Sequence, residues 1–181
     1  MDRFLEALAA PTAAPGGGSA ACYAGAMAAA AAEMCAGLAA KKDKPGAQEL
    51  LGPLADLRRR FVEQADLDAK AFDVVMAAYR EPKDAPERRE HIAAGLKGAA
   101  LSPLKTLDLV LELADLIRAA EPLVPASARS DWESSVVFAA AAADVAGRNV
   151  AINLDGAADA DALRAALAER RAALGDRLPK V

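Results

Sequence analysis

The residue best suited to proton chemistry in this 181-residue chain is Asp68. It falls on the apolar stripe of a predicted helix, whereas Asp66, two positions earlier, falls on the polar face. A carboxylate among apolar side chains is costly, and burial raises its pKa, which suits such a group for moving protons. A structural ion pair with a lysine or with Arg148 is an equally good interpretation.

Asp131 differs from Asp68 because it lies at the predicted start of a helix. The segment SDWE matches a capping box, with Ser130 as the cap and Glu133 reaching back to it. The helix dipole favours negative charge at this end, which suits Asp131 for stabilising a positive charge. Simple helix capping is the alternative.

Two further groups of polar residues are candidate binding sites. Gly16, Gly17 and Gly18 precede Ser19 at the predicted start of an alanine-rich helix, where they form either a flexible turn or a backbone surface that a ligand approaches closely. Asn149 and Asn153 lie one turn apart near the end of another apolar helix. These two amides either bind a polar ligand or satisfy the helix end.

Other patterns exclude several kinds of site. No histidine, cysteine and carboxylate group has the spacing of metal ligands, so we expect no metal site. The single histidine, His91, lies beside charged residues on a predicted solvated face, and there is no support for a serine, histidine and aspartate triad. The glycine run lacks the lysine and serine or threonine of a P-loop.

Charge and cysteine content narrow the setting. The net charge is −4, and the basic residues form no stripe interleaved with aromatics, so we expect no nucleic-acid partner. Cys22 and Cys35 lie about 20 Å apart on one predicted helix and cannot pair, which fits a reducing cytoplasm. The first ten residues do not resemble a signal peptide. Residues 20–40 are long enough to span a bilayer, but they are mostly alanine and contain Glu33, so we expect a buried helix and no membrane partner.

Alanine and leucine dominate the chain, with few aromatic or β-branched residues, which predicts a single all-α domain over residues 1–181. The apolar periodicity predicts a six-helix, bundle-like domain with two long central helices. The helices are expected near residues 4–8, 19–40, 47–80, 87–120, 130–153 and 160–174. Because the second helix is apolar on nearly every side, a second subunit should help to cover it, which predicts a homodimer.

Several segments in this order resemble one family. They are FLEALAAPTAAPGGGSAA, KKDK, DLDAKAFDVVMAAYREPK, SPL, SDWESSV and NVAIN. Together they resemble the cyclodeaminase and methenyltetrahydrofolate cyclohydrolase domain of the formiminotransferase-cyclodeaminase family. The resemblance covers most of the chain. It implies an all-helical dimer that binds reduced folate in a cleft beside the glycine turn, near the subunit interface, with the tetrahydrofolate derivative as substrate and no other cofactor.

The resemblance also implies an acid–base reaction at the one-carbon unit between N5 and N10 of tetrahydrofolate. Asp68 and Asp131 would supply the proton carrier and the stabilisation of positive charge, and Lys41 is the alternative proton carrier. Lys41 and Lys42 would also attract the glutamate carboxylates of the substrate, unless they only terminate a helix. The glycine turn, Ser19, Ser130, Asn149 and Asn153 complete the expected binding residues.

One segment departs from the family pattern. Family members usually have a lysine, glycine and asparagine segment before SD, whereas this chain reads VPASAR, and Trp132 and Glu133 are expected to narrow the cleft. Three functions therefore stay open. We favour the cyclohydrolase over the cyclodeaminase, because no formiminotransferase domain is fused here. A non-catalytic folate-binding or scaffolding paralogue is the alternative of another class.

Overall fold

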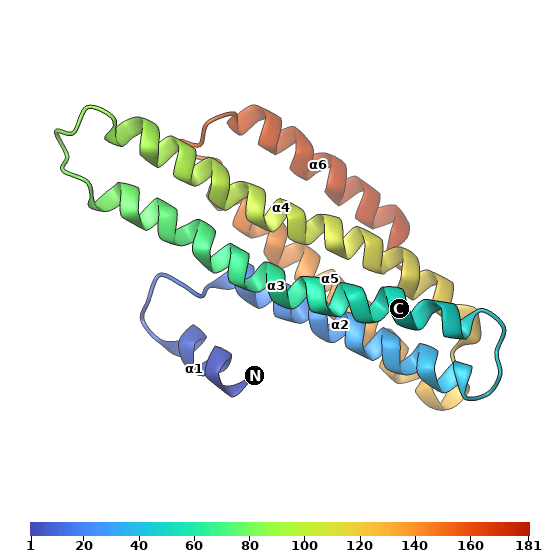
Figure 1. Ribbon diagram of the computed structural model, residues 1–181. Helices are drawn as coiled ribbons and strands as arrows, with labels where there is room; N and C mark the ends of the chain where they lie inside the picture. The colour runs from blue at the N-terminus through green and yellow to red at the C-terminus, as the bar shows by residue number, and fades with distance from the viewer.

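The computed structural model describes residues 1–181, and all its regular structure is helical (Figure 1). Six α-helices follow one another along the chain, with two short 3-10 turns before the fifth. Their bounds are α1 Asp2–Ala9, α2 Gly17–Ala40, α3 Ala47–Arg80, α4 Arg88–Ala120, η1 Glu121–Leu123, η2 Ala126–Ala128, α5 Arg129–Ile152 and α6 Ala160–Arg177. The all-α class, the number of helices and the two long helices α3 and α4 are confirmed.

Helices α2 to α5 form a four-helix bundle, and α6 packs on α4 and α5. In this bundle α2 contacts α3 and α5, while α4 contacts α3 and α5 from the other side. The two long helices α3 and α4 run side by side and are joined by a loop at one end of the molecule (Figure 1). Helix α1 buries no residue, but the ring of Phe4 stacks at 4.0 Å, centroid to centroid, on that of Tyr23 in α2.

Small side chains let α2 approach its neighbours closely. Gly25 faces the buried ring of Phe61 on α3, and a Cβ at position 25 would lie only 2.7 Å from Cζ of that ring. Half of the 24 residues of α2 are buried within the chain. The others include Met27 and Met34, whose side chains remain exposed. The chain alone therefore does not cover every side of this apolar helix.

The predicted capping box at Ser130 is wrong. Helix α5 begins at Arg129 after Ala128, and no side chain caps it. The reason is that the 3-10 turn η2 runs directly into α5, with the Ala128 N–H donating to the Pro125 carbonyl, so that Ser130 already lies inside the helix. Its own carbonyl accepts a hydrogen bond from the Ser134 hydroxyl at 2.8 Å.

Two helical segments, Gly17–Ala40 and Ala126–Ile152, are long and apolar enough to cross a membrane by length and composition alone. The same composition is found in buried core helices, so this property does not distinguish the two settings. In the bundle these segments contribute Cys35, Ala36, Trp132 and Ala139 to the core.

Candidate active site

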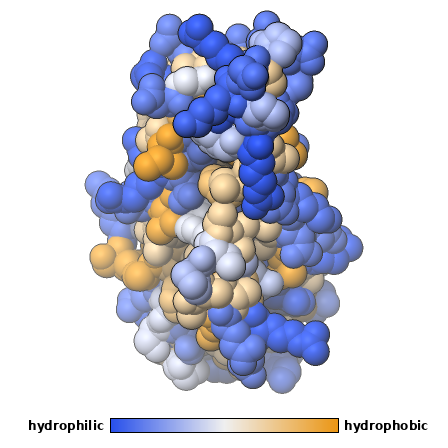
Figure 2. Space-filling view, turned by 90° about the vertical axis from the view of Figure 1, so that its left-hand side faces the viewer, coloured by the Kyte–Doolittle hydropathy of each residue, from blue (hydrophilic) through white to orange (hydrophobic).

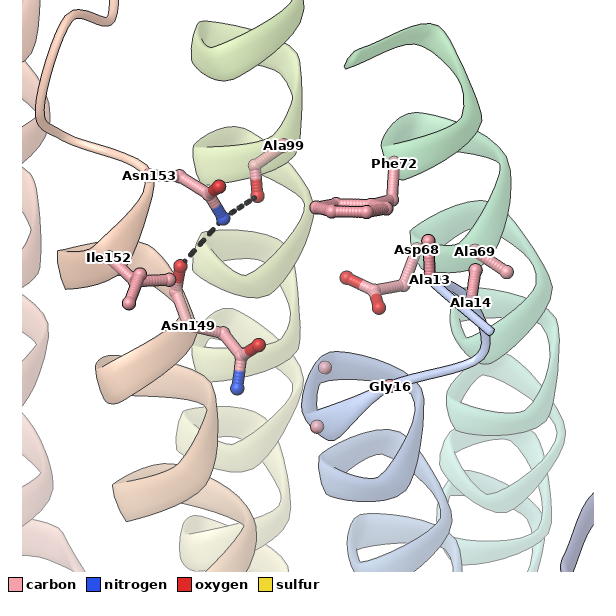
Figure 3. Close-up of a pocket in the computed structure, with 12 residues that line it drawn as sticks. Ala13, Ala14, Gly16, Asp68, Ala69, Phe72, Ala99, Asn149, Ile152 and Asn153 are labelled. Carbon is pink, nitrogen blue, oxygen red and sulfur yellow. Dashed lines mark hydrogen bonds between the residues drawn. The ribbon is translucent and has the colours of Figure 1, made fainter. Parts of the chain in front are cut away.

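A pocket of about 210 Å³ lies where α2 begins and α5 ends (Figure 3). Helix α3 contributes Asp68 and Phe72, α2 contributes the glycine turn, and α5 contributes Asn149 and Asn153. Asp68 is the one charged residue in this lining. Figure 3 shows its carboxyl group pointing from α3 toward the start of α2 and the two asparagines on α5.

Figure 2 shows the end of the molecule that faces left in Figure 1, where α1 and the α3–α4 loop lie. Weakly apolar residues gather in the middle of this face, and hydrophilic residues surround them. The lining of the pocket has the same character, because half of its twelve residues are hydrophobic.

The three glycines at the start of α2 have different neighbours. A Cβ at Gly18 would lie 2.7 Å from the carboxyl carbon of Asp68, so the absence of a side chain creates the space for that carboxyl group. A Cβ at Gly17 would lie 3.0 Å from Nδ2 of Asn149. A Cβ at Gly16 would lie near only one atom, the Ala13 carbonyl oxygen, at 3.9 Å. Gly17 and Gly18 therefore form one wall of the pocket.

The Asp68 carboxyl group is held by two serine hydroxyls. Ser19 Oγ lies 3.2 Å from Oδ2, and Ser102 Oγ on α4 lies 3.1 Å from Oδ1. Burial raises the pKa of Asp68, and the hydrogen bonds from Ser102 and Ser19 oppose that rise. The interpretation of Asp68 as a structural ion pair is wrong, because it pairs with no cation and Arg148 pairs instead with Asp144. Asp68 is thus a partly buried carboxyl group without a countercharge.

The two asparagines present oxygen atoms to the pocket. Nδ2 of Asn149 donates to the Val145 carbonyl at 2.9 Å, and Nδ2 of Asn153 donates to the carbonyls of Asn149 and Ala99 at 2.8 Å and 3.3 Å. A backbone carbonyl only accepts, so these contacts fix which atom of each amide is nitrogen. The two Oδ1 atoms have no hydrogen bond within the chain and are available to accept one from a ligand.

Four predicted site residues lie at the opposite end of the bundle, where α2 ends and α5 begins (Figure 1). Lys41 and Lys42 follow the last turn of α2, about 35 Å along that helix from Gly18, and Ser130 and Asp131 lie in the first turn of α5, about 27 Å from Asn149. The expected grouping of Asp131 and Lys41 around Asp68 does not form within one chain. The physical reason is that α2 and α5 are long, straight neighbours that run in opposite directions.

Trp132 does not narrow a cleft, contrary to expectation. Its ring is fully buried, and Nε1 donates to the Ile117 carbonyl at 3.0 Å. Glu133 pairs with Arg129 on the surface at 3.2 Å. The altered segment before Ser130 therefore belongs to the far end of the bundle and its core, and not to the pocket at Asp68.

The remaining reactive side chains are poorly placed for nucleophilic chemistry. Burial raises the pKa of the Cys22 thiol to about 12 and that of Cys35 to about 11, so neither is a thiolate at neutral pH. His91 is half exposed and lies 2.9 Å from Glu81 near the α3–α4 loop. The chain has no group of three or more histidine, cysteine, aspartate or glutamate residues arranged to hold a metal ion.

Two residues of the site were not predicted from the sequence: Ser102, which donates a hydrogen bond to Asp68, and Gln64, which donates one to Ser102. Gln64 Nε2 donates at 3.0 Å both to the Ser102 hydroxyl oxygen and to the Ser102 carbonyl. The available signal was weak: Ser102 and Gln64 are polar residues on otherwise apolar helix faces. The partly buried Phe72 also lines the pocket.

Several known proteins are similar to this chain in sequence. The sequence model of a family described as formiminotransferase-cyclodeaminase matches residues 1–172. A methenyltetrahydrofolate cyclohydrolase from Methylorubrum extorquens is 33% identical over 88% of this chain and 81% of that protein. A formimidoyltransferase-cyclodeaminase from Sus scrofa is 28% identical over 94% of this chain, which spans 33% of that longer protein.

The fold is similar to that of a solved relative. The crystal structure of a formiminotetrahydrofolate cyclodeaminase from Thermotoga maritima superposes with a TM-score of 0.87 and 25% sequence identity. The match covers 98% of this chain and 91% of the other.

The raised pKa of Asp68 predicts how its removal changes stability with pH. The folded protein binds this proton more tightly than the unfolded chain, whose aspartates titrate near ~3.9. The stability that Asp68 contributes is therefore fully present below that pH and is lost as the pH rises through the folded-state pKa. We expect the free energy of unfolding of Asp68→Asn, relative to wild type, to rise as the pH increases above about 4 and to level off once the folded-state pKa has been passed.

Urea denaturation across this pH range measures the difference. Asp66→Asn removes an exposed carboxylate from the same helix and is the matched control. A difference between Asp68→Asn and wild type that stays constant with pH, or that follows the control, would show that burial does not raise the pKa of Asp68.

Proposed function

Because the chain belongs to the formiminotransferase-cyclodeaminase family, we propose that it is a methenyltetrahydrofolate cyclohydrolase. In this reaction water attacks the cationic carbon between N5 and N10 of tetrahydrofolate, and the ring opens to 10-formyltetrahydrofolate. The observation that carries the proposal is the single carboxyl group of the pocket, Asp68, which is partly buried and has no countercharge. A cationic substrate supplies that charge.

Asp68 acts as the proton carrier. Attack of water on the methenyl carbon forms a carbinol and releases one proton, which the ionised carboxylate accepts. Collapse of the carbinol forms the formyl group and breaks the bond to N5; the hydroxyl loses its proton, and N5 gains one. One proton is released overall, and Asp68 returns to its ionised form.

The other pocket residues bind and orient the substrate. Oδ1 of Asn149 and Oδ1 of Asn153 accept hydrogen bonds from N–H groups of the reduced pterin, while the ring of Phe72 gives a flat apolar wall. Gly16, Gly17 and Gly18 let the substrate approach the start of α2 closely. Ser19 forms a hydrogen bond with Asp68, and we count it among the binding residues of the proposed site.

The second candidate function is formiminotetrahydrofolate cyclodeaminase, which the structural similarity to the Thermotoga maritima enzyme favours. There N10 attacks a formimino carbon and ammonia leaves. Both reactions act on the same carbon and need a proton carrier beside it, so Asp68 serves either one.

We propose three features of the setting. The reaction transfers no electrons, so acid–base groups suffice and no cofactor is needed besides the tetrahydrofolate substrate. The two free, buried cysteines suit a reducing cytoplasm. Residues 1–181 act as one helical domain, since a continuous apolar core joins α2 to α6.

We further propose that the chain is a homodimer whose partner completes the site. The pocket is smaller than the roughly 300–1,000 Å³ of most ligand sites, so part of the substrate must lie outside it. Exposed apolar side chains lie on α2 and α5: Met27, Met34, Val137 and Phe138. Pairing two copies of α2 in antiparallel orientation about its middle would bring the partner's Lys41 and Lys42 beside the first chain's glycine turn.

The proposed dimer gives a role to the four predicted site residues at the opposite end of the bundle. Lys41 and Lys42 are exposed and form no ion pair within the chain, so they are free to bind the glutamate carboxylates of a substrate held by the other subunit. Ser130 and Asp131 lie at the same end, since Cys35 on α2 contacts the Ala128 carbonyl just before α5. Asp131 would then stabilise positive charge from the partner side.

The two candidate reactions are distinguished by incubating the purified protein with methenyltetrahydrofolate and with formiminotetrahydrofolate. We expect the absorbance of the methenyl group to fall without ammonia release. Formation of the methenyl group together with ammonia would instead identify a cyclodeaminase. Neither change, with folate still bound in a calorimetric titration, would identify a non-catalytic folate-binding protein.

Asp68→Asn should lower turnover by ~100-fold or more, because the amide cannot accept the proton. Substrate affinity should change far less, since Asn keeps the shape of the side chain. Steady-state kinetics measure both quantities, and Asp66→Asn on the exposed face is the control. Full turnover in Asp68→Asn with an unchanged pH profile would show that Asp68 is not the proton carrier.

The shared site predicts complementation between two defective variants. Light scattering should give about twice the chain mass of 18.6 kDa. In a mixed dimer of Asp68→Asn and the double variant Lys41→Ala, Lys42→Ala, one site contains wild-type Asp68 and wild-type lysines. We expect mixing to restore activity above that of either variant alone. Monomer mass, or no gain on mixing folded variants that exchange subunits, would contradict the shared site.

A further inference from the structure

A chain of hydrogen bonds runs from the Asp68 carboxyl group to Ser102 on α4 and back to Gln64, which lies one turn before Asp68 on nearly the same face of α3. Ser102 Oγ contacts Oδ1 of Asp68 at 3.1 Å, and Gln64 Nε2 contacts Ser102 Oγ at 3.0 Å. Gln64 and Ser102 are both buried, and Gln64 does not line the pocket. A substrate in the pocket therefore reaches Gln64 only through Ser102 and Asp68.

The direction of each hydrogen bond in this chain is fixed by its chemistry. Gln64 Nε2 also lies 3.0 Å from the Ser102 carbonyl oxygen, which only accepts, so the atom facing Ser102 must be the amide nitrogen. This nitrogen uses its two protons on the Ser102 carbonyl and the Ser102 hydroxyl oxygen. The single proton of that hydroxyl is left to be donated to Oδ1 of Asp68.

Ser19 differs from Ser102 because its hydroxyl has one proton to donate and two acceptor oxygens within reach. Its Oγ lies 3.2 Å from Oδ2 of Asp68 and 3.2 Å from the Ala65 carbonyl. When Asp68 is ionised, the Ser19 hydroxyl donates to Oδ2. When Oδ2 carries a proton, it donates to Ser19 Oγ, and the Ser19 hydroxyl turns to Ala65. Ser19 thus fits both protonation states of Asp68, whereas Ser102 is always a donor.

We propose that Gln64 and Ser102 are positioning residues that hold the Ser102 hydroxyl as a fixed donor to Oδ1, so that Asp68 exchanges its proton at Oδ2, beside Ser19. When Asp68 is protonated, the oxygen that accepts the fixed hydrogen bond, Oδ1, is favoured as the carbonyl oxygen of the acid. The proton then lies on the other oxygen, Oδ2. The proton moves from the attacking water to Oδ2 and later leaves from the same atom. This step rests on the proposed role of Asp68.

Two serine hydroxyls and the Ser19 backbone N–H donate hydrogen bonds to Asp68, and no charged group faces it. From α2, the Cys22 thiol is neutral because burial raises its pKa to about 12. From α5, Asn149 and Asn153 carry no charge. From α4, the nearest cation in sequence is Lys105, which is exposed in the groove that Gln64 lines on the other side of the helix pair.

The test is a titration of the Asp68 side-chain carboxyl carbon by NMR in the full-length protein, which reads the proton without needing activity. Ser102→Ala should raise the pKa of Asp68 by about one pH unit, the size expected for losing a hydrogen bond to a charged group. Ser102→Thr, which keeps the hydroxyl, should stay near wild type. Ser19→Ala should raise it less, because Ser19 supports both states.

A double-mutant cycle tests Gln64. Gln64→Met removes the donor that orients Ser102, so it should raise the pKa of Asp68 in the wild type but leave it unchanged in the Ser102→Ala background. Equal shifts in the two backgrounds, or a larger shift in Ser19→Ala than in Ser102→Ala, would overturn the proposal. Should Ser102→Ala fail to fold, the same cycle is run with Ser102→Cys, a weaker donor.

The pH dependence of turnover separates this proposal from the proposed function. If Asp68 is the base, the acidic limb of the kcat/KM profile should move with the NMR titration in Ser102→Ala. If the NMR titration of Asp68 moves in Ser102→Ala but the acidic limb of the kcat/KM profile does not, the positioning role of Ser102 is supported and the catalytic role of Asp68 is contradicted. The same conclusion follows if the titration moves and the protein shows no turnover. A titration that does not move overturns the positioning chain whatever the activity.

Discussion

The close approach of the start of α2 to α3 is the constraint on which the site depends. The Asp68 carboxyl group occupies the space that a side chain at Gly18 would fill. The same closeness continues along the helix pair, where Gly25 receives the ring of Phe61. Because α2 is built from small residues, its first turn reaches Asp68 with the Ser19 hydroxyl, and the pocket gains a backbone wall. A larger residue at Gly18 would remove both features together.

Helix positions and the setting of Asp68 were predictable from the sequence because both depend on a local period. Apolar residues at helical spacing place Asp68 on the buried side of α3 and Asp66 on the exposed side, as found. Glycine content identified the start of α2, although Gly17 and Gly18 lie in its first turn and not before it, and the side chain that occupies the space beside Gly18 was not predicted. The capping box failed because it was judged from residue types alone, and the 3-10 turn before α5 starts the helix at Arg129 instead.

The rest of the site could not be predicted because it depends on how helices distant in sequence align. Ser102 meets Asp68 only through the register of α4 against α3, a separation of 34 residues. The order of residues along the chain also does not predict that Lys41 and Asp131 lie far from Asp68. Residues that share a site in a symmetric assembly can lie at opposite ends of one chain, and a family pattern read along the sequence does not distinguish the two cases.

The proposed site is compatible with both reactions of the family. In the proposed function, a single unpaired acid, two amide oxygens and a backbone wall would hold the pterin end of a folate and move protons at its one-carbon unit, whichever nucleophile attacks. Hydrolysis and cyclisation differ in whether water or N10 reaches the carbon. That choice depends on how N10 and its benzoylglutamate arm are held. The pocket of about 210 Å³ is too small for that arm, so the selectivity must arise from the surface around it, which in the proposed dimer includes the partner subunit.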